Sequence, residues 1–391
     1  MNLHNTFTDY MKNEMKYDLM SPEQVKKALG QDMYEFQQSD NELSLYHHPE
    51  LGVTVAKWVD DLITRGPKEN TEKFWVGIEK RFNLKSRGYV TEKEPRVFCG
   101  KKISMEKKKN KKWYSIDMTD DMKQWLKDMG VMGMRPVQTP MKDRQELYSD
   151  MRLLSEEEAT AVRSKMGSLQ YYCKEWRWDC AAAVNIVAQT VKEPTEGTKK
   201  ALDRILAYLV GTADHKLWVA RVKGTKWDFY GDFDHAGERK WGDSRSRTGI
   251  MLLCNGMPFH WRSTKQPDTA MSSAAAEIVA MSECMKDVNL RLWIAEEAGI
   301  KVIWPAEIKV DNAAGVSFQN NMNPDSKLKG VFDMRLDWLK QLHDKKKFRA
   351  IKVATEKNLA DALTKPLAPV VKRSLEVELS RILELRASGP I

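Results

Sequence analysis

The chain has 391 residues, which is enough for two or three domains with ordinary hydrophobic cores. Lysine and arginine outnumber aspartate and glutamate by 64 to 55, and the resulting net charge of +9 suits a polyanionic partner without specifying one. The five cysteines are scattered and include no Cys-x-x-Cys pair, so the sequence supports neither a zinc knuckle nor a disulfide framework.

The start of the chain bears on localisation. Residues 1–20 are polar and charged and lack the apolar stretch of a secretory signal. No apolar run approaches the length of a membrane span. We therefore expect an intracellular protein, located in the cytoplasm, the nucleus or both, that is neither secreted nor bound to a membrane.

The first hundred residues begin with a polar segment, 1–40, in which helices are expected at Asn5–Met15 and Pro22–Leu29. Two strands are expected next, at Asn41–Tyr46 and Val53–Val59, with a turn between them. The second strand ends on Asp60-Asp61. An aspartate pair at a strand end is common, so these residues alone are a weak signal.

A helix is expected at Asn70–Phe82, where phenylalanine and isoleucine recur four residues apart. Further on, Phe98–Ile103 and Trp113–Ile116 resemble the two strands of a hairpin. Between these strands lies a run of lysines. A lysine run is usually a solvated loop, but beside Trp113 and Tyr114 a mobile loop that contacts nucleic-acid phosphates is the alternative. The lysines in question are Lys107, Lys108, Lys109, Lys111 and Lys112.

A second set of strands is expected after residue 223. Apolar and polar residues alternate from Trp227 to Asp234, which predicts a strand with one face buried and with Asp232 and Asp234 on the other face. A strand at Thr248–Cys254 then leads into Asn255-Gly256 and another apolar run. Asn-Gly between two such runs is a strong signal for a hairpin.

The hairpin is followed by helices and strands in alternation. Ser272-Ser273 can cap a helix in which apolar residues recur every three or four positions as far as Ala295, and Gly299 suits its C-terminal stop. Short strands are expected at Ile308–Val310 and Ile351–Val353. Asn358–Leu367 is expected to open the last helix, which Pro366 ends, and residues 371–391 to form a terminal helix.

One carboxylate stands at each of four junctions in this region: Asp232, Glu277, Asp311 and Asp361. Four converging carboxylates repel one another unless cations neutralise them. Hard divalent cations that prefer oxygen ligands, Mg²⁺ or Mn²⁺, are the natural occupants. Two such ions about 3.5–4 Å apart form the clamp used for in-line displacement at phosphodiesters.

These motifs closely resemble the ribonuclease H domain of copia-type retrotransposon polyproteins. The resemblance rests on the strand Asp228–Gly237, the helix start Ser272–Glu277, the Asp311-Asn312 junction and the stretch Asn358–Leu367. Upstream, Trp58-Val59-Asp60-Asp61 resembles the aromatic-Val-Asp-Asp hairpin of a reverse transcriptase palm. The resemblance covers roughly residues 40 to 370.

The resemblance implies an α+β and α/β architecture in successive segments. After the N-terminal segment 1–40, it implies a partial palm over 41–141 and a helical thumb or connection over 142–222. A ribonuclease H-like domain with a mixed five-stranded sheet and flanking helices would occupy 223–370, followed by the tail 371–391. Asp60 and Asp61 would be a vestigial polymerase metal site.

The sequence also departs from the family. A palm needs a further aspartate on an earlier strand, and nothing before residue 60 resembles that segment or the fingers, so we expect the polymerase part to be truncated and inactive. In the nuclease part, His235 replaces a tryptophan and Ala275 a first glutamate. Val331 and Asp337 stand where the family carries histidines, and if one of those histidines helps proton transfer or product release, turnover would be slower.

The resemblance implies a two-metal endonuclease that cuts the RNA strand of RNA–DNA hybrids. In that mechanism Asp232 would bridge both ions, Glu277 and Asp311 would complete one site, and Asp361 would help hold the second. Other retroelement polypeptides are further expected partners. Two alternatives remain open: a non-catalytic nucleic-acid-binding remnant, and an RNA-directed DNA polymerase completed by a missing upstream segment.

Overall fold

The structure is a computed structural model that describes residues 11, 35–84, 86–108, 110–234, 237, 239–267, 269, 273–311 and 333–388. It divides into two compact units. The first comprises Met1–Met105 with Asn289–Val302, and the second Glu106–Val288 with Ile303–Ile391. Among the described helices, none combines the length and the apolar character needed to cross a membrane. The expected N-terminal helices lie outside the described residues, apart from Met11.

The first unit is built on a four-stranded antiparallel sheet in the order β1-β2-β3-β4. Its strands are β1 (Gln37–Gln38), β2 (Leu45–His48), β3 (Val53–Trp58) and β4 (Asp61–Arg65). Helix α4 (Lys68–Arg81) packs Phe74 and Ile78 into its core. The strand expected at Asn41–Tyr46 is displaced toward the C-terminus, because β2 pairs His47 and His48 with Thr54 and Val53.

The expected hairpin at the aspartate pair is present. Trp58 pairs with Asp61, which leaves Val59 and Asp60 as the two turn residues. Val59 has a φ of 53°, an unusual conformation for a β-branched residue. The Asp61 carboxylate accepts a hydrogen bond from the backbone N–H of Cys99 at 3.4 Å.

A further four-stranded sheet has the order β5-β6-β7-β8 and contains β5 (Arg96–Phe98), β6 (Lys101–Lys108), β7 (Lys111–Asp117) and β8 (Leu217–Ala220). The boundary between the units falls inside β6. The interpretation of the lysine run as a loop is wrong for its described members, since Lys107 and Lys108 end β6 while Lys111 and Lys112 begin β7. Lys109 lies outside the described residues.

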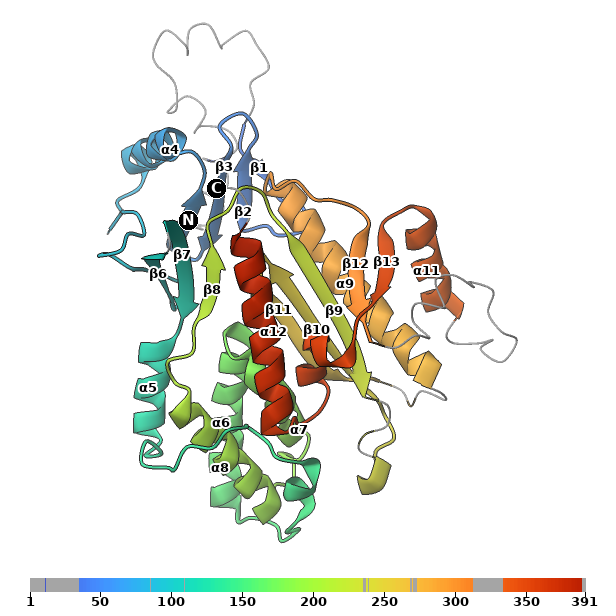
Figure 1. Ribbon diagram of the computed structural model, residues 1–391. Helices are drawn as coiled ribbons and strands as arrows, with labels where there is room; N and C mark the ends of the chain where they lie inside the picture. Colours follow the sequence, from blue (N-terminus) through green and yellow to red (C-terminus); the bar gives the residue numbers. More distant parts are fainter. Residues whose placement is uncertain are drawn as a thin grey trace, which may run out of the picture. The chain divides into compact units, whose positions relative to one another are not determined.

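The middle of the second unit is helical (Figure 1). Helix α6 begins with a capping box in which Ser155 and Glu158 satisfy each other's backbone N–H groups. The α-helices are α5 (Thr119–Asp128), α6 (Glu156–Glu175), α7 (Ala181–Ala188) and α8 (Glu196–Gly211), with 3₁₀ turns η2 (Arg144–Tyr148) and η3 (Trp178–Cys180).

The second unit also contains the five-stranded sheet, in the order β11-β10-β9-β12-β13. β9, β10 and β11 are antiparallel neighbours, whereas β12 runs parallel to β9 and to β13, so the sheet is mixed, as expected. The strands are β9 (Trp227–Asp234), β10 (Arg247–Cys254), β11 (Met257–Lys265), β12 (Ala306–Val310) and β13 (Phe348–Lys352). The β10–β11 turn is the expected Asn255-Gly256, with φ values of 50° and 84°.

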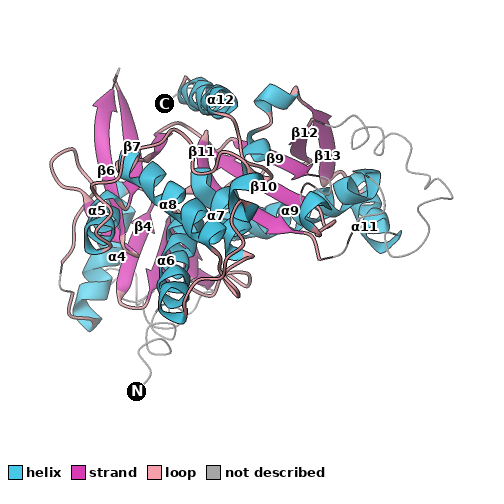
Figure 2. Ribbon diagram, turned by 90° about the horizontal axis from the view of Figure 1, so that it is seen from below, coloured by secondary structure: helices cyan, strands magenta, loops and turns pink. Residues whose placement is uncertain are grey.

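Helices cover both faces of this sheet. Cys284 of α9 (Ser273–Glu297) lies against Gly231 on one face of β9, and Arg386 of α12 (Pro369–Ala387) reaches Asp228 on the other. Figures 1 and 2 show α9 and α12 on opposite sides of the strands. The expectation that β9 buries one face is therefore wrong, because Asp228, Phe229 and Tyr230 are all buried.

The segment after β13 differs from the expected single helix. Thr355–Lys357 and Leu359–Leu363 form 3₁₀ turns η6 and η7, and α12 begins separately at Pro369. The Asn358 side chain accepts the backbone N–H of Ala360 and so starts η7 as a cap. The expected terminal helix is confirmed as α12. A further described helix, α11 (Asp333–Asp344), precedes β13.

Candidate functional site

Asp232 lies on the central strand β9, two residues before the strand ends at Asp234. It is 8% exposed, and its Oδ2 accepts a hydrogen bond of 2.6 Å from the hydroxyl of Thr364. Burial is the largest cause that raises the pKa of Asp232, to about 7; the nearby carboxylates of Asp361 and Asp311 act in the same direction, while the Thr364 hydroxyl and the charge of Lys365 oppose the shift. The metal-free site therefore disfavours the charged form of Asp232.

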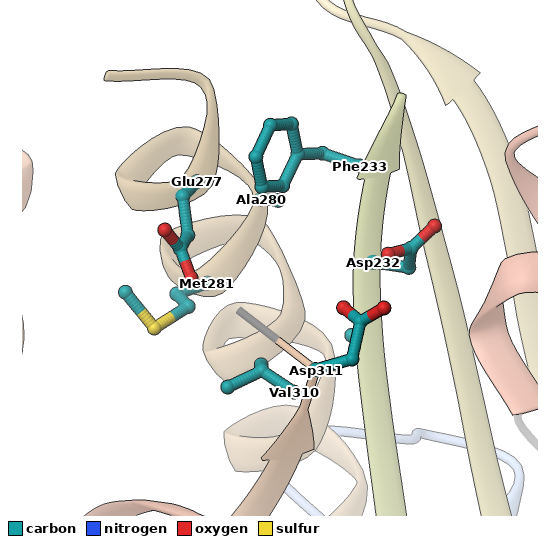
Figure 3. Close-up of a pocket in the computed structure, with 8 residues that line it drawn as sticks. Asp232, Phe233, Glu277, Ala280, Met281, Val310 and Asp311 are labelled. Atoms are coloured by element: carbon teal, nitrogen blue, oxygen red, sulfur yellow. The ribbon is translucent and has the colours of Figure 1, made fainter. Parts of the chain in front are cut away.

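Three of the four predicted carboxylates line one pocket (Figure 3). Figure 3 shows Asp232 and Asp311 near each other at the ends of β9 and β12, with Glu277 across the pocket on α9. Glu277 is only 3% exposed. The pocket is lined by Gly231, Asp232, Phe233, Glu277, Ala280, Met281, Val310 and Asp311.

The fourth carboxylate, Asp361, lies on η7 and is also buried. Its Oδ1 is 2.6 Å from the ammonium of Lys365. Burial raises the pKa of Asp361, and Asp311 and Asp234 act in the same direction, against the stabilising charge of Lys365. Asp361 is therefore electrostatically coupled to the pocket but has an intramolecular cation as its partner.

The close approach of η7 to the sheet depends on a glycine. Gly249 on β10 pairs with Asp232. A Cβ atom at Gly249 would lie 2.6 Å from the carbonyl oxygen of Ala360 and 2.8 Å from Cγ2 of Thr364. A side chain here would push η7 away from the strand, and with it both Asp361 and the hydroxyl that contacts Asp232.

Asn358 connects the strand ends beneath the pocket. Its side chain is fully buried, and Nδ2 lies 3.2 Å from the carbonyl oxygen of Gly231, 3.4 Å from Oδ1 of Asp311 and 3.5 Å from Oδ1 of Asp232. One amide thus holds two carboxylates side by side. Asn358 and Thr364 fall within the motif Asn358–Leu367, which indicates no role for either, and no local sequence pattern points to Arg144, which reaches the same turn.

The carboxylate side chains of the site are of the chemical type that binds a hard divalent cation. Carboxylate oxygens are the ligands that Mg²⁺ and Mn²⁺ prefer, and the raised pKa values of Asp232 and Asp361 reflect burial and a repulsion that a cation would relieve. Within the described part of the chain, however, no three His, Cys, Asp or Glu side chains are grouped closely enough to hold a metal ion. Side-chain movement would be needed to form a coordination shell.

The remaining predicted site residues lie elsewhere. Asp60 and Asp61 belong to the first unit, whereas the four carboxylates belong to the second. In the lysine hairpin, Lys108 places its ammonium 4.1 Å from the ring centroid of Trp218. Lys111 donates to the carbonyl of Ala387 at the end of α12. Lys107 and Lys112 are exposed.

The sequence was compared with those of known proteins and protein families. No protein-family model matches the sequence. The Retrovirus-related Pol polyprotein from transposon RE1 of Arabidopsis thaliana is 28% identical over 336 residues, which is 84% of this chain and 22% of that protein. The corresponding Pol polyprotein from transposon TNT 1-94 of Nicotiana tabacum is 26% identical over 323 residues, 80% of this chain and 23% of that protein.

A shorter relative is the Secreted RxLR effector protein 161 of Plasmopara viticola, 35% identical over 124 residues, 32% of this chain and 86% of that protein. The chain spans about a fifth of the length of the Pol polyproteins that it matches. The similarity to those polyproteins nevertheless extends over most of this chain. Over most of its length the chain is therefore a distant homologue of the copia-type retroelement Pol polyproteins.

Proposed function

We propose that the second unit is a ribonuclease H-type endonuclease that uses Mg²⁺ or Mn²⁺ to cut the RNA strand of RNA–DNA hybrids. One observation carries the proposal: strands β9 and β12 and helix α9 bring Asp232, Asp311 and Glu277 to a single pocket. The distant homology to retroelement Pol polyproteins supports a nucleic-acid substrate. The net charge of +9 has the sign that such a substrate requires.

Asp232, Glu277 and Asp311 would hold the ions, joined by Asp361 once it separates from Lys365. When bound, the ions supply a nucleophilic water at neutral pH and neutralise charge on the leaving oxygen. The chain's own residues prepare the site: Asn358 fixes Asp232 beside Asp311, and the Thr364 hydroxyl orients the Asp232 carboxylate. Phe233 and Met281 line the pocket with apolar surface.

A hybrid is distinguished from duplex DNA by the 2′-hydroxyls of its RNA strand and by its more A-like shape. The exposed Lys107 and Lys112 are the members of the lysine hairpin best placed to contact phosphates. For the first unit we propose a vestigial polymerase role for Asp60 and Asp61, which their position at a hairpin supports.

A second candidate function is a nucleic-acid-binding protein without nuclease activity. It is favoured by the lack of a ready metal-holding group in the described residues and by the Asp361–Lys365 ion pair, which gives one carboxylate an internal cation. The two candidates make different predictions for metal binding. A nuclease must bind divalent cations through its carboxylates, whereas a binding remnant need not.

The discriminating experiment is a Mn²⁺ titration followed by electron paramagnetic resonance, with Asp311→Asn as the site variant and the exposed Asp214→Asn as the matched control. The nuclease proposal expects saturable Mn²⁺ binding that Asp311→Asn weakens and Asp214→Asn leaves unchanged. Binding of a labelled RNA–DNA hybrid without any carboxylate-dependent Mn²⁺ binding would favour the second candidate.

A further inference from the structure

A buried arginine from far upstream reaches the end of strand β9. Arg144 lies on η2, 90 residues before its partner Asp234, and is 8% exposed. Its Nη2 donates to Oδ2 of Asp234 at 2.5 Å and to the carbonyl oxygen of Thr364 at 2.9 Å. One guanidinium group therefore contacts both the strand that carries Asp232 and the turn that follows η7.

The fold leaves room for this contact. A Cβ atom on Gly237 would lie 2.0 Å from Oδ2 of Asp234 and 2.2 Å from Nη1 of Arg144, so a larger residue at this position would require the ends of these two side chains to shift. The guanidinium group is planar and permanently charged, and it can hold two acceptors at once in a fixed geometry. A lysine ammonium lacks that geometry.

The contact continues to the candidate site through one residue. Thr364 accepts from Arg144 with its carbonyl oxygen and donates with its hydroxyl to Oδ2 of Asp232. That hydrogen bond leaves Oδ1 of Asp232 on the side of Asn358 and Asp311. The orientation of the Asp232 carboxylate thus depends on where Thr364 is held.

We propose that Arg144 is a positioning residue for the candidate nuclease: it clamps Thr364 against the end of β9 and thereby sets the orientation of Asp232. The proposal rests on the proposed function. It also places a required residue outside the segment 223–370, in which the nuclease is expected from the sequence. Residues that orient metal-binding side chains affect activity or metal affinity by roughly 10- to 100-fold.

The test compares Arg144→Ala with Arg204→Ala in the full-length chain. Arg204 is a matched control because it also binds this segment, through Glu146 at 3.6 Å and Thr139 at 3.2 Å, but contacts none of the site residues. Hydrogen exchange of the metal-free proteins, read by mass spectrometry, reports on the clamp independently of activity. Cleavage of an RNA–DNA hybrid then gives kcat and KM, with and without added guanidinium at millimolar concentration.

We expect Arg144→Ala to speed exchange in residues 358–365 and to lower kcat by roughly tenfold or more with KM unchanged. Added guanidinium should restore part of kcat, which a general loss of folding would not allow, and Arg204→Ala should change none of these. Unchanged exchange in 358–365, or equal effects of the two variants, would overturn the proposal. If exchange responds but the wild-type chain never cleaves hybrid, the proposed function fails and the clamp is a structural contact only.

Discussion

Two buried aspartates on β9 have opposite electrostatic surroundings. Asp228 and Asp232 lie four positions apart and are 2% and 8% exposed. Arg386 donates to both oxygens of Asp228, at 2.6 and 2.9 Å, and the Lys309 ammonium lies 2.6 Å from Oδ1. Burial opposes the charge on Asp228, but these two cations keep its pKa below the ordinary value. Asp232 has a raised pKa; the hydrogen-bond donors that reach it from the described residues, Asn358 and Thr364, are neutral, and Lys365 lowers its pKa only through its charge.

The metal-free chain should therefore lose stability as pH rises between the ordinary aspartate pKa and about 7. In that window the folded state binds a proton at Asp232 that the unfolded state has released, so the free energy of unfolding falls with pH. Asp232→Asn removes the charge, and we expect it to stabilise the chain by about 1–4 kcal/mol at about pH 8 and by much less at about pH 5. Urea unfolding with a chelator present measures both values.

Asp228→Asn is the matched comparison on the same strand. It leaves Lys309 and Arg386 without their shared carboxylate, so we expect it to destabilise the chain at neutral pH by roughly 2–4 kcal/mol. Equal effects of the two substitutions at about pH 8 would show that the surroundings of Asp232 and Asp228 do not differ in this way.

The local sequence pattern predicts where the carboxylates lie, but not which side chains contact them. Alternation places Asp228 and Asp232 on one face of a strand, because the side-chain period of a strand is fixed at two residues. Arg386 lies 158 residues from Asp228, and Arg144 lies 220 residues from Thr364. The spacing of residues along the sequence carries no information about contacts over such separations. These partners could therefore be identified only from the folded structure.

The β6–β7 hairpin contains lysines that look equivalent in the sequence but have different surroundings in the structure. Lys107 and Lys112 are exposed, whereas Lys111 contacts the last turn of α12. We expect Lys107→Gln combined with Lys112→Gln to weaken hybrid binding and to reduce the slope of log affinity against log salt by about 0.7–0.9 for each phosphate that these lysines neutralise in the wild type. Fluorescence anisotropy over a series of salt concentrations measures the slope.

Lys111→Gln provides the contrast within the same hairpin. It removes a cation from a helix C-terminus, so it should lower stability by about 0.3–1 kcal/mol and leave the salt slope unchanged. A smaller salt slope for Lys111→Gln than for the double variant would contradict this division of the hairpin.

The order of elements in the five-stranded sheet could be predicted because each strand is bounded by strong local signals. The Asn255-Gly256 turn and the Gly299 helix stop, with a φ of 71°, are examples. The structure of the segment after β13 could not be predicted, because the spacing of apolar residues in Asn358–Leu367 fits either a helix or 3₁₀ turns. Packing against Gly249 decides between them. Strand β8 could not be predicted either, because its residues form a strand only through their pairing with β7.

On the scale of the whole molecule, the helices α5 to α8 and the five-stranded sheet share one hydrophobic core. It joins Leu169, Val187 and Ile205 to Met251 and Leu363. Polar contacts cross the same junction: Trp261 Nε1 donates to the carbonyl of Cys173 at 2.6 Å, and the Lys265 ammonium lies 2.7 Å from Oε1 of Gln189. The candidate nuclease segment therefore depends on helices that precede it in the chain.

We accordingly expect a fragment of residues 223–391 to lose cooperative thermal unfolding and near-ultraviolet circular dichroism, because one side of its core would face water. The full-length chain measured in parallel is the control. A fragment that unfolds cooperatively at the same midpoint as the full chain would show that the sheet and α9 to α12 fold without those helices.

The most direct test of the central claim is cleavage of an RNA–DNA hybrid, labelled separately on each strand, by the purified chain with Mg²⁺ or Mn²⁺. We expect the wild type to cut the RNA strand, to spare the DNA strand and duplex DNA, and to stop when a chelator is added. Asp232→Asn, which keeps the side-chain size but removes the charge, should abolish cleavage, while the exposed Asp214→Asn retains it. Cleavage by Asp232→Asn at the wild-type rate, or no metal-dependent cleavage by a wild type that binds the hybrid, would contradict it.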